Sequence, residues 1–182
     1  LIGGLFGTMG KGVRIVRPLR IYVAKHCHFE DETVLQWGAY IAALHEHDQP
    51  PVLKIGARTM IGNHAHIVAT RRVEFGRSVL TADRLFVADN RHTYEDPRRP
   101  VRDQGLTQLA DVTIGDGSWI GENVCITGAS VGAHCVIAAN SVVTRDIPDA
   151  CVAAGAPARV VKRFCEERQS WLRTDAHGGF CE

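Results

Sequence analysis

The chain has 182 residues, of which 45% are hydrophobic, and this is enough for one domain with a sizeable core. Its 21 lysine and arginine residues nearly balance its 20 aspartate and glutamate residues, so the net charge favours neither nucleic acid nor an acidic membrane surface as a partner. No run of about 18 apolar residues exists to cross a bilayer, and we expect no membrane insertion.

The cysteines predict a reducing environment. They form no C-x-x-C pair and show no regular spacing, and a chain of this size folds without disulfides. The opening L-I-G-G-L-F-G is too short for the apolar region of a signal peptide. We therefore expect reduced thiols in a cytoplasmic protein at all six positions: Cys27, Cys125, Cys135, Cys151, Cys165 and Cys181.

From residue 23 onward an aliphatic residue recurs every six positions, usually with a small residue directly after it and a small or medium residue four positions after it. A period of six fits neither an amphipathic helix nor an alternating strand, but it fits one short strand and one turn per repeat, stacked as parallel coils around one core. The predicted inward residues in the first position are Val23, Phe29, Leu35, Ile41, Ile55, Ile61, Ile67, Val73, Phe75, Thr81, Val87, Ile114, Ile120, Ile126, Val131, Ile137 and Val143. Those in the fourth position after such a residue, called fourth-position residues below, are Cys27, Thr33, Ala39, Thr59, Ala65, Val79, Leu85, Ser118, Val124, Cys135 and Ser141. The sequence thus predicts an all-β parallel β-helix.

Two insertions and a tail interrupt this repeat. Residues 42–54 form an excursion that contains prolines, and residues 89–111 form a long polar loop, which is usually functional in a compact fold. After Pro148 the repeat ends, and residues 158–172 predict a C-terminal helix. We expect a β-helix domain over residues 1–157, followed by a helix and tail over residues 158–182.

The hexapeptides, the loop D-N-R-H-T-Y-E-D-P-R-R-P-V-R-D-Q-G (89–105) and the tail A-A-G-A-P-A-R-V-V-K (153–162) together resemble the hexapeptide-repeat acyltransferases. The resemblance covers about residues 20–165 and is to the galactoside, maltose and xenobiotic acetyltransferase group. The loop looks most like sugar O-acetyltransferases of surface polysaccharide assembly, with the pattern D-H-x-H-x-Y-x-D, although Asn90 replaces the first histidine. The resemblance implies a left-handed helix, a homotrimer with active sites between subunits, acetyl-CoA as cosubstrate and no required metal.

His92 occupies the second histidine position of that pattern, which is the catalytic base of the family. A neutral imidazole suits removal of a hydroxyl proton as the oxygen attacks the thioester. Asp89 is a candidate to orient the imidazole or to bind the acceptor, or it is a solvated loop carboxylate. The remaining loop candidates are expected to contact acceptor hydroxyls or to stiffen the loop: Asn90, Tyr94, Asp96 and Gln104.

For the donor, the resemblance implies a groove for acetyl-CoA between neighbouring subunits. The matching positions are Trp119, Glu122, Ala139, Thr144, Arg145, Arg159 and Lys162. The basic residues near the end of the repeat can pair with phosphate oxygens: Arg145, Arg159, Lys162 and Arg163. The alternative for the last three is an ordinary solvated helix face.

Several alternatives stay open. Three H-x-H pairs suggest a zinc enzyme like the γ-class carbonic anhydrases, although no histidines lie five residues apart as in that family. The pairs are His26 and His28, His45 and His47, and His64 and His66. Cys125 and Cys135 suggest an acyl-enzyme, but a thiol at an inward position is usually inert. A non-catalytic trimeric scaffold is a further alternative. For an acetyltransferase the predicted acceptor is a sugar hydroxyl of a glycan precursor, with an antibiotic or an amino sugar as alternatives.

Overall fold

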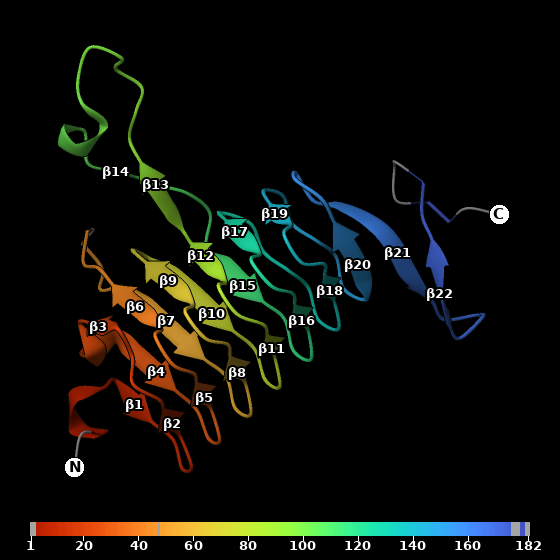
Figure 1. The fold of residues 1–182 in the computed structure, drawn as a ribbon, viewed down its shortest axis with the longest axis horizontal. Coiled ribbons are helices and arrows are strands. Elements are labelled where there is room, and N and C mark those ends of the chain that lie inside the picture. The colour runs from red at the N-terminus through yellow and green to blue at the C-terminus, as the bar shows by residue number, and fades with distance from the viewer. Residues whose placement is uncertain (1–2, 47, 176–178, 181–182) are drawn as a thin grey trace.

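The structure is a computed structural model that describes residues 3–46, 48–175 and 179–180. It is a left-handed parallel β-helix, in which each coil gives one short strand to each of three sheets before the chain rises to the next coil (Figure 1). The only helical segments in the described ranges are the short 3-10 turns η1 (Gly3–Leu5), η2 (Ala24–His26) and η3 (Val101–Asp103). This architecture confirms the predicted fold class.

The strands make three parallel sheets and one small antiparallel pair. Sheet A consists of β1 (Thr8–Met9), β4 (Cys27–Phe29), β7 (Val52–Ile55), β10 (Arg72–Phe75) and β15 (Val112–Ile114). Sheet B consists of β2 (Arg14–Ile15), β5 (Val34–Leu35), β8 (Met60–Ile61), β11 (Leu80–Thr81), β16 (Trp119–Ile120), β18 (Val136–Ile137), β20 (Cys151–Ala154), β21 (Arg159–Cys165) and β22 (Ser170–Arg173). Sheet C consists of β3 (Arg20–Tyr22), β6 (Tyr40–Ala43), β9 (His66–Ala69), β12 (Phe86–Ala88), β17 (Cys125–Thr127) and β19 (Val142–Val143). The separate pair is β13 (Asn90–His92) with β14 (Leu106–Gln108).

The core lies inside the three sheets and follows the hexapeptide register. All predicted fourth-position residues are buried, and so are the predicted first-position residues except one. Val23 is exposed, because the chain there adopts a left-handed conformation (φ 51°) before η2 instead of continuing a strand. Each buried aliphatic or phenyl side chain contributes about 1.5–3 kcal/mol, so the stacked core stabilises the coils.

Close stacking explains the small residue after each aliphatic one. A Cβ placed on Gly56 would meet the backbone carbonyl of Gly76 in the next coil, and one on Gly62 would meet the carbonyl of Ala82. Coils stacked about 4.8 Å apart leave no room for larger side chains at these corners.

The outward surfaces of the three sheets differ in chemistry. Sheet A is polar, with an ion pair of 2.8 Å between Arg72 and Glu74. Sheet B presents a row of apolar side chains in register, of which Met60, Leu80 and Trp119 are 37%, 48% and 51% exposed. Sheet C presents a row of stacked rings: Tyr22, Tyr40, His66 and Phe86, with neighbouring centroids 4.5–5.8 Å apart. Burial in that row lowers the pKa of His66.

The predicted C-terminal helix is wrong. After β20 the chain turns at Gly155 (φ 101°) and returns as β21, which pairs antiparallel with β20, and β22 then pairs antiparallel with β21. The edge of β20 would otherwise be left open at the end of the prism, and pairing of that edge outweighs the helix propensity of the segment. Sheet B therefore continues across residue 157, and the division of the chain into two parts there stays a prediction.

Two more expectations concern membrane insertion and the cysteines. No helix in the described ranges is long and apolar enough to span a bilayer. Cys27, Cys125, Cys135, Cys151 and Cys165 are free thiols, whereas Cys181 lies outside the described residues.

Candidate active site

The long insertion forms an antiparallel hairpin that projects from the corner between sheets C and A (Figure 1). Its first strand, β13, follows β12 directly and carries His92, which pairs through its backbone with Leu106. The imidazole is exposed, and no described residue forms a hydrogen bond with either ring nitrogen. Both nitrogens are therefore open to a substrate.

Asp89 ties the base of this hairpin to the coil below it. Its carboxylate is completely buried and accepts hydrogen bonds from the backbone N–H groups of Thr70, Arg71 and Arg72 at 2.7–3.1 Å. The Nδ2 of Asn90 donates a further bond of 2.9 Å. The idea of a solvated carboxylate is therefore wrong, and the same contacts leave Asp89 no surface for an acceptor. Asp89 fixes where β13 begins, three residues before His92.

Sequence reasoning missed two other residues at this base. The Thr70 hydroxyl lies 2.9 Å from both Asp89 Oδ1 and Gln108 Oε1, and Gln108 Nε2 donates to the carbonyls of Asp89 and Leu109. These contacts join one turn and the two ends of the insertion. They lie 19 and 38 residues apart along the chain, so no local pattern marks them.

The tip of the hairpin is closed by its own side chains. Gln104 Nε2 donates to the carbonyls of Asp96 and Arg99 at 2.9 Å, and Gln104 Oε1 accepts from the Asp96 N–H at 3.1 Å. The Asp96 carboxylate accepts from Arg98 at 2.9 Å, and this contact lowers the pKa of Asp96. Of the two roles expected for Gln104 and Asp96, these contacts support loop rigidity.

Asn90 and Tyr94 differ in how far a ligand can reach them. Asn90 is 8% exposed and its amide is committed to Asp89. Tyr94 is 60% exposed, and the Arg91 guanidinium lies over its ring at 4.4 Å. Tyr94 is therefore the expected acceptor contact with the most open surface.

The residues expected to bind the donor fall into two groups on different sides of the prism. Trp119 and Lys162 lie in one outward row of sheet B, because Trp119 pairs with Val136, Val136 with Val152, and Val152 with Lys162. Arg159 pairs with Ala154 on the same sheet.

The second group follows sheet C. Thr144 and Arg145 are exposed just beyond β19, at the corner from which the His92 hairpin also leaves. One chain does not bring these residues to the Trp119 row, because sheet C lies between that corner and sheet B.

Ala139 and Glu122 sit between the two groups, at the corner between sheets B and C. Ala139 is exposed, whereas the Glu122 carboxylate is engaged in an ion pair with Arg84 of the coil below. Glu122 therefore already has a partner inside the chain.

The two alternative chemistries, a cysteine acyl-enzyme and a zinc enzyme, receive less support from the structure. Burial raises the pKa of Cys135 to about 11, which keeps this thiol protonated and poorly nucleophilic at neutral pH. Among the residues described, no three histidine, cysteine, aspartate or glutamate side chains gather as ligands of a metal ion. The rings of His64 and His66 pack on different neighbours, Trp37 and Tyr40, and His47 lies outside the described ranges.

Comparisons with known proteins agree with a stack of hexapeptide coils. Residues 111–145 match the family model described as the hexapeptide repeat of succinyl-transferase. The chain is 33% identical over 158 residues to the protein named "Probable acetyltransferase Rv3034c" of Mycobacterium tuberculosis, covering 85% of this chain and 49% of the relative. It is 34% identical over 135 residues to the galactoside O-acetyltransferase of Escherichia coli, covering 70% of this chain and 65% of that relative.

A solved structure agrees. The maltose O-acetyltransferase from Clostridium difficile 630 is 28% identical, with a TM-score of 0.60 over 90% of this chain and 72% of that one. The chain is therefore similar in sequence and fold to acetyltransferases built from hexapeptide repeats. It spans between about half and two thirds of the length of the two sequence relatives above.

Proposed function

We propose that this protein transfers an acetyl group from acetyl-CoA to a sugar hydroxyl, with His92 as the general base, in the cytoplasm. The observation that carries the proposal is the exposed His92 imidazole on a hairpin that is fixed at its base by the buried Asp89 carboxylate. The galactoside and maltose acetyltransferases among its relatives support a sugar acceptor, and the free thiols support a reducing compartment. The loop pattern around His92 favours an acceptor in a surface polysaccharide or glycan precursor.

In the proposed reaction His92 removes the hydroxyl proton while the acceptor oxygen attacks the thioester carbonyl. A C–O bond forms, the tetrahedral intermediate collapses, and the C–S bond breaks to release CoA. Asp89 acts as a positioning residue in this scheme, because its bonds place β13 and touch neither substrate nor imidazole. Tyr94 is the proposed acceptor contact.

We further propose that three copies form a ring with each active site between two of them. Sheet B carries an exposed apolar row and sheet C a half-buried aromatic row, whereas sheet A is polar. Two different apolar faces favour a head-to-tail contact that closes into a ring, rather than a two-fold dimer that uses one face twice. Such a contact would bring Trp119 and Lys162 of one copy toward His92 and Arg145 of the next, and so unite the two groups of donor residues.

The transfer itself is tested with radiolabelled acetyl-CoA and a panel of galactosides, maltosides and nucleotide sugars. The His92→Ala variant should lose at least about 100-fold in kcat while the KM for acetyl-CoA stays unchanged, because general-base catalysis contributes on that scale. Exposure of His92 predicts an unchanged melting temperature. Full activity of this variant would show that another group takes the proton.

The trimeric ring is tested by placing a carboxylate on the apolar face of sheet B and, separately, on the polar face of sheet A. Leu80→Glu should dissociate the trimer, because a carboxylate in an apolar interface loses its hydration. Thr8→Glu, on the exposed surface of sheet A, is the matched control and should leave the assembly intact. The measurement is molar mass by light scattering after size-exclusion chromatography. A monomeric parent protein would contradict the ring without touching the role of His92.

A further inference from the structure

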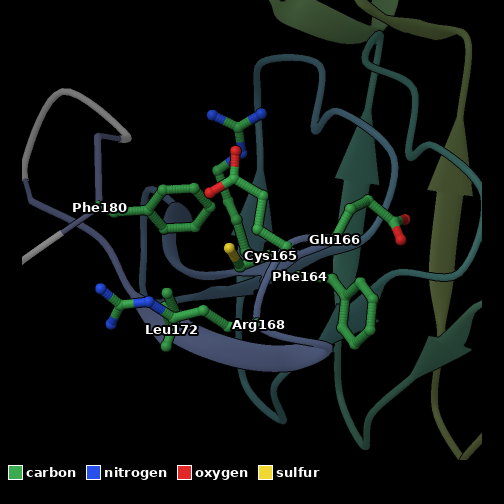
Figure 2. A pocket seen from close by; sticks show the side chains of 8 residues that line it. Phe164, Cys165, Glu166, Arg168, Leu172 and Phe180 are labelled. Carbon is green, nitrogen blue, oxygen red and sulfur yellow. The ribbon is translucent and has the colours of Figure 1, made fainter.

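The two ends of the prism differ in how the core is covered. At the C-terminal end the chain folds back over the last coil, where the buried Ala158 donates its N–H to the Val142 carbonyl at 2.8 Å. Figure 2 shows Phe180, Leu172 and Cys165 gathered beside the hairpin that follows. At the other end β1, β2 and β3 are the terminal strands of their sheets. The described residues leave the inward side chains of this first coil only half-buried: Phe6, Met9, Val13, Ile15 and Ile21.

Cations surround this N-terminal end. The first 29 residues contain five lysine or arginine residues and no aspartate or glutamate, so the other 16 cations share the rest of the chain with all 20 carboxylates. The small net charge of the chain therefore combines two regions of opposite charge. The five cations follow the perimeter of the first coil at intervals of three to five residues, and all of them are exposed: Lys11, Arg14, Arg17, Arg20 and Lys25.

Carboxylates of the next coil approach one of the five. The Lys11 N–H donates to the Asp31 carboxylate at 2.8 Å, and the Glu32 N–H donates to the Lys11 carbonyl. Both acidic side chains lower the positive potential at that corner. No described residue forms an ion pair with any of the other four cations, which are called the cationic rim below: Arg14, Arg17, Arg20 and Lys25.

The cationic rim covers two walls and two corners of the end. Arg14 begins β2 and Arg20 begins β3, so these two lie on the first strands of sheets B and C. Arg17 lies in the turn between the two strands, with φ 40°. Lys25 lies in η2, at the corner between sheets C and A. Four like charges on one coil repel each other, and an anionic surface placed against the end would relieve that repulsion.

Exposed aliphatic side chains lie among these cations. Leu19, directly before Arg20, is 74% exposed, and Leu5 is 65% exposed. The Gly7 N–H donates to the Ala24 carbonyl, so the segment that carries Leu5 lies against η2. Basic and aliphatic side chains on one surface match the interface of an anionic bilayer, where cations meet headgroups and aliphatic groups enter the acyl boundary.

The same features disfavour two other occupants. A nucleic acid or another soluble polyanion would pair with the cations, but its phosphates or sulfates offer no apolar contact to Leu5 and Leu19. A second copy joined end to end would place one cationic rim against another, and like charges in an interface are costly.

The proposed ring would multiply the effect of each rim. Copies that meet through sheets B and C lie side by side around one axis, so their N-terminal ends face in the same direction. Three linked sites on one surface bind more tightly than a single site does. Docking by one copy does not require the ring.

We propose that the N-terminal end of the prism docks on the headgroups of an anionic lipid membrane through the cationic rim and the side chains of Leu5 and Leu19. This surface contact goes beyond acetyl transfer and does not depend on it. The cytoplasmic leaflet, which faces the location proposed above, is the anionic one. The hairpin that carries His92 leaves the prism three strands further along sheet C, or about 14 Å at 4.8 Å per strand, so a docked protein keeps this hairpin free.

The test is cosedimentation of the full chain with vesicles of phosphatidylcholine alone and of phosphatidylcholine mixed equally with phosphatidylserine. We expect binding to the mixed vesicles only, and we expect salt to weaken it. Arg17→Gln combined with Lys25→Gln should lower the partition coefficient about 30-fold, because each cation at an anionic surface contributes about fivefold.

The matched control removes the same charge elsewhere. Arg58→Gln combined with Arg77→Gln changes two exposed cations at the corner between sheets A and B in later coils, and Arg58 shares the left-handed conformation of Arg17 (φ 60°). This double variant should change the partition coefficient less than about twofold.

A third variant distinguishes a membrane from a soluble polyanion. Leu19→Gln should lower partitioning into the mixed vesicles about fivefold, because it removes aliphatic surface from the contact, and should leave binding to heparin unchanged. The exposure of Arg17, Leu19 and Lys25 predicts the parent melting temperature for all these variants.

Every other result overturns the membrane contact. Equal binding to the two kinds of vesicle would exclude recognition of anionic headgroups. Equal losses in the two double variants would assign binding to total charge and not to the rim. Binding to heparin without binding to vesicles would assign the end to a soluble polyanion, and an end-to-end dimer that Leu19→Gln dissociates, without vesicle binding, would assign it to a second copy. Acetyl transfer is measured separately on soluble acceptors, so failure of either proposal leaves the other standing.

Discussion

The two hairpins that leave the hexapeptide pattern are attached to the prism in different ways. The β13–β14 hairpin is not part of any of the three sheets and is held at its base by side-chain contacts, chiefly those of the buried Asp89 carboxylate, with Thr70 and Gln108 beside it. The β21–β22 hairpin continues sheet B through main-chain pairing and needs no such anchor. An inserted hairpin can therefore carry a reactive group away from the coils, whereas an added hairpin lengthens an existing surface.

The largest expected effect concerns the anchor of the first hairpin. Asp89→Ala leaves the backbone N–H groups of Thr70, Arg71 and Arg72 without their acceptor, one of them buried and two partly buried, and a buried group left in this way costs about 1–3 kcal/mol. We expect the free energy of unfolding in urea to fall by about 3 kcal/mol or more, with loss of acetyl transfer.

Asp96→Ala at the tip of the same hairpin is the control, because its carboxylate is bound only to the exposed Arg98 side chain and backbone. Its expected loss is under about 0.5 kcal/mol. Equal losses in the two variants would mean that the hairpin is not held at its base.

A smaller effect is expected at the tip itself. Gln104→Ala removes three hydrogen bonds that close residues 96–104 on themselves. Because these bonds lie outside the core, the unfolding free energy should change by about 1 kcal/mol or less, while hydrogen exchange in the tip becomes faster. If kcat falls several-fold while the melting temperature stays constant, the closed tip contributes to activity and not to stability. An unchanged exchange rate would show that the ion pairs of the tip suffice.

The repeat could be predicted because its six-residue period is visible along the linear sequence. A six-residue spacing places Ile55, Ile61 and Ile67 on three successive walls of one coil, and all three are buried as predicted. The long insertion was predictable from its length and polarity alone. Its anchor was not, because Thr70 and Gln108 meet Asp89 only after the coils have stacked.

The second hairpin was predicted wrongly for a related reason. Residues 158–172 contain good helix formers, and their choice of strand depends on the open edge of β20, which is itself a product of folding. The position of Arg173 opposite Lys162 was equally hidden, because the two residues are eleven positions apart and become neighbours only in the hairpin.

The smallest expected effect separates stability from binding in that second hairpin. Lys162→Glu places a carboxylate opposite Arg173 and replaces repulsion by attraction, so the unfolding free energy should rise by about 0.5 kcal/mol. The same change should weaken CoA binding, because a negative charge then faces the phosphates. Lys162→Gln removes the repulsion without adding an attraction and should lie between the two in stability. Urea unfolding and CoA titration of the three proteins measure both quantities. Lower stability of Lys162→Glu would show that solvent already screens the cation pair. Higher stability with weaker CoA binding is the expected result. It would mean that the two opposed cations destabilise the hairpin and serve to bind a ligand.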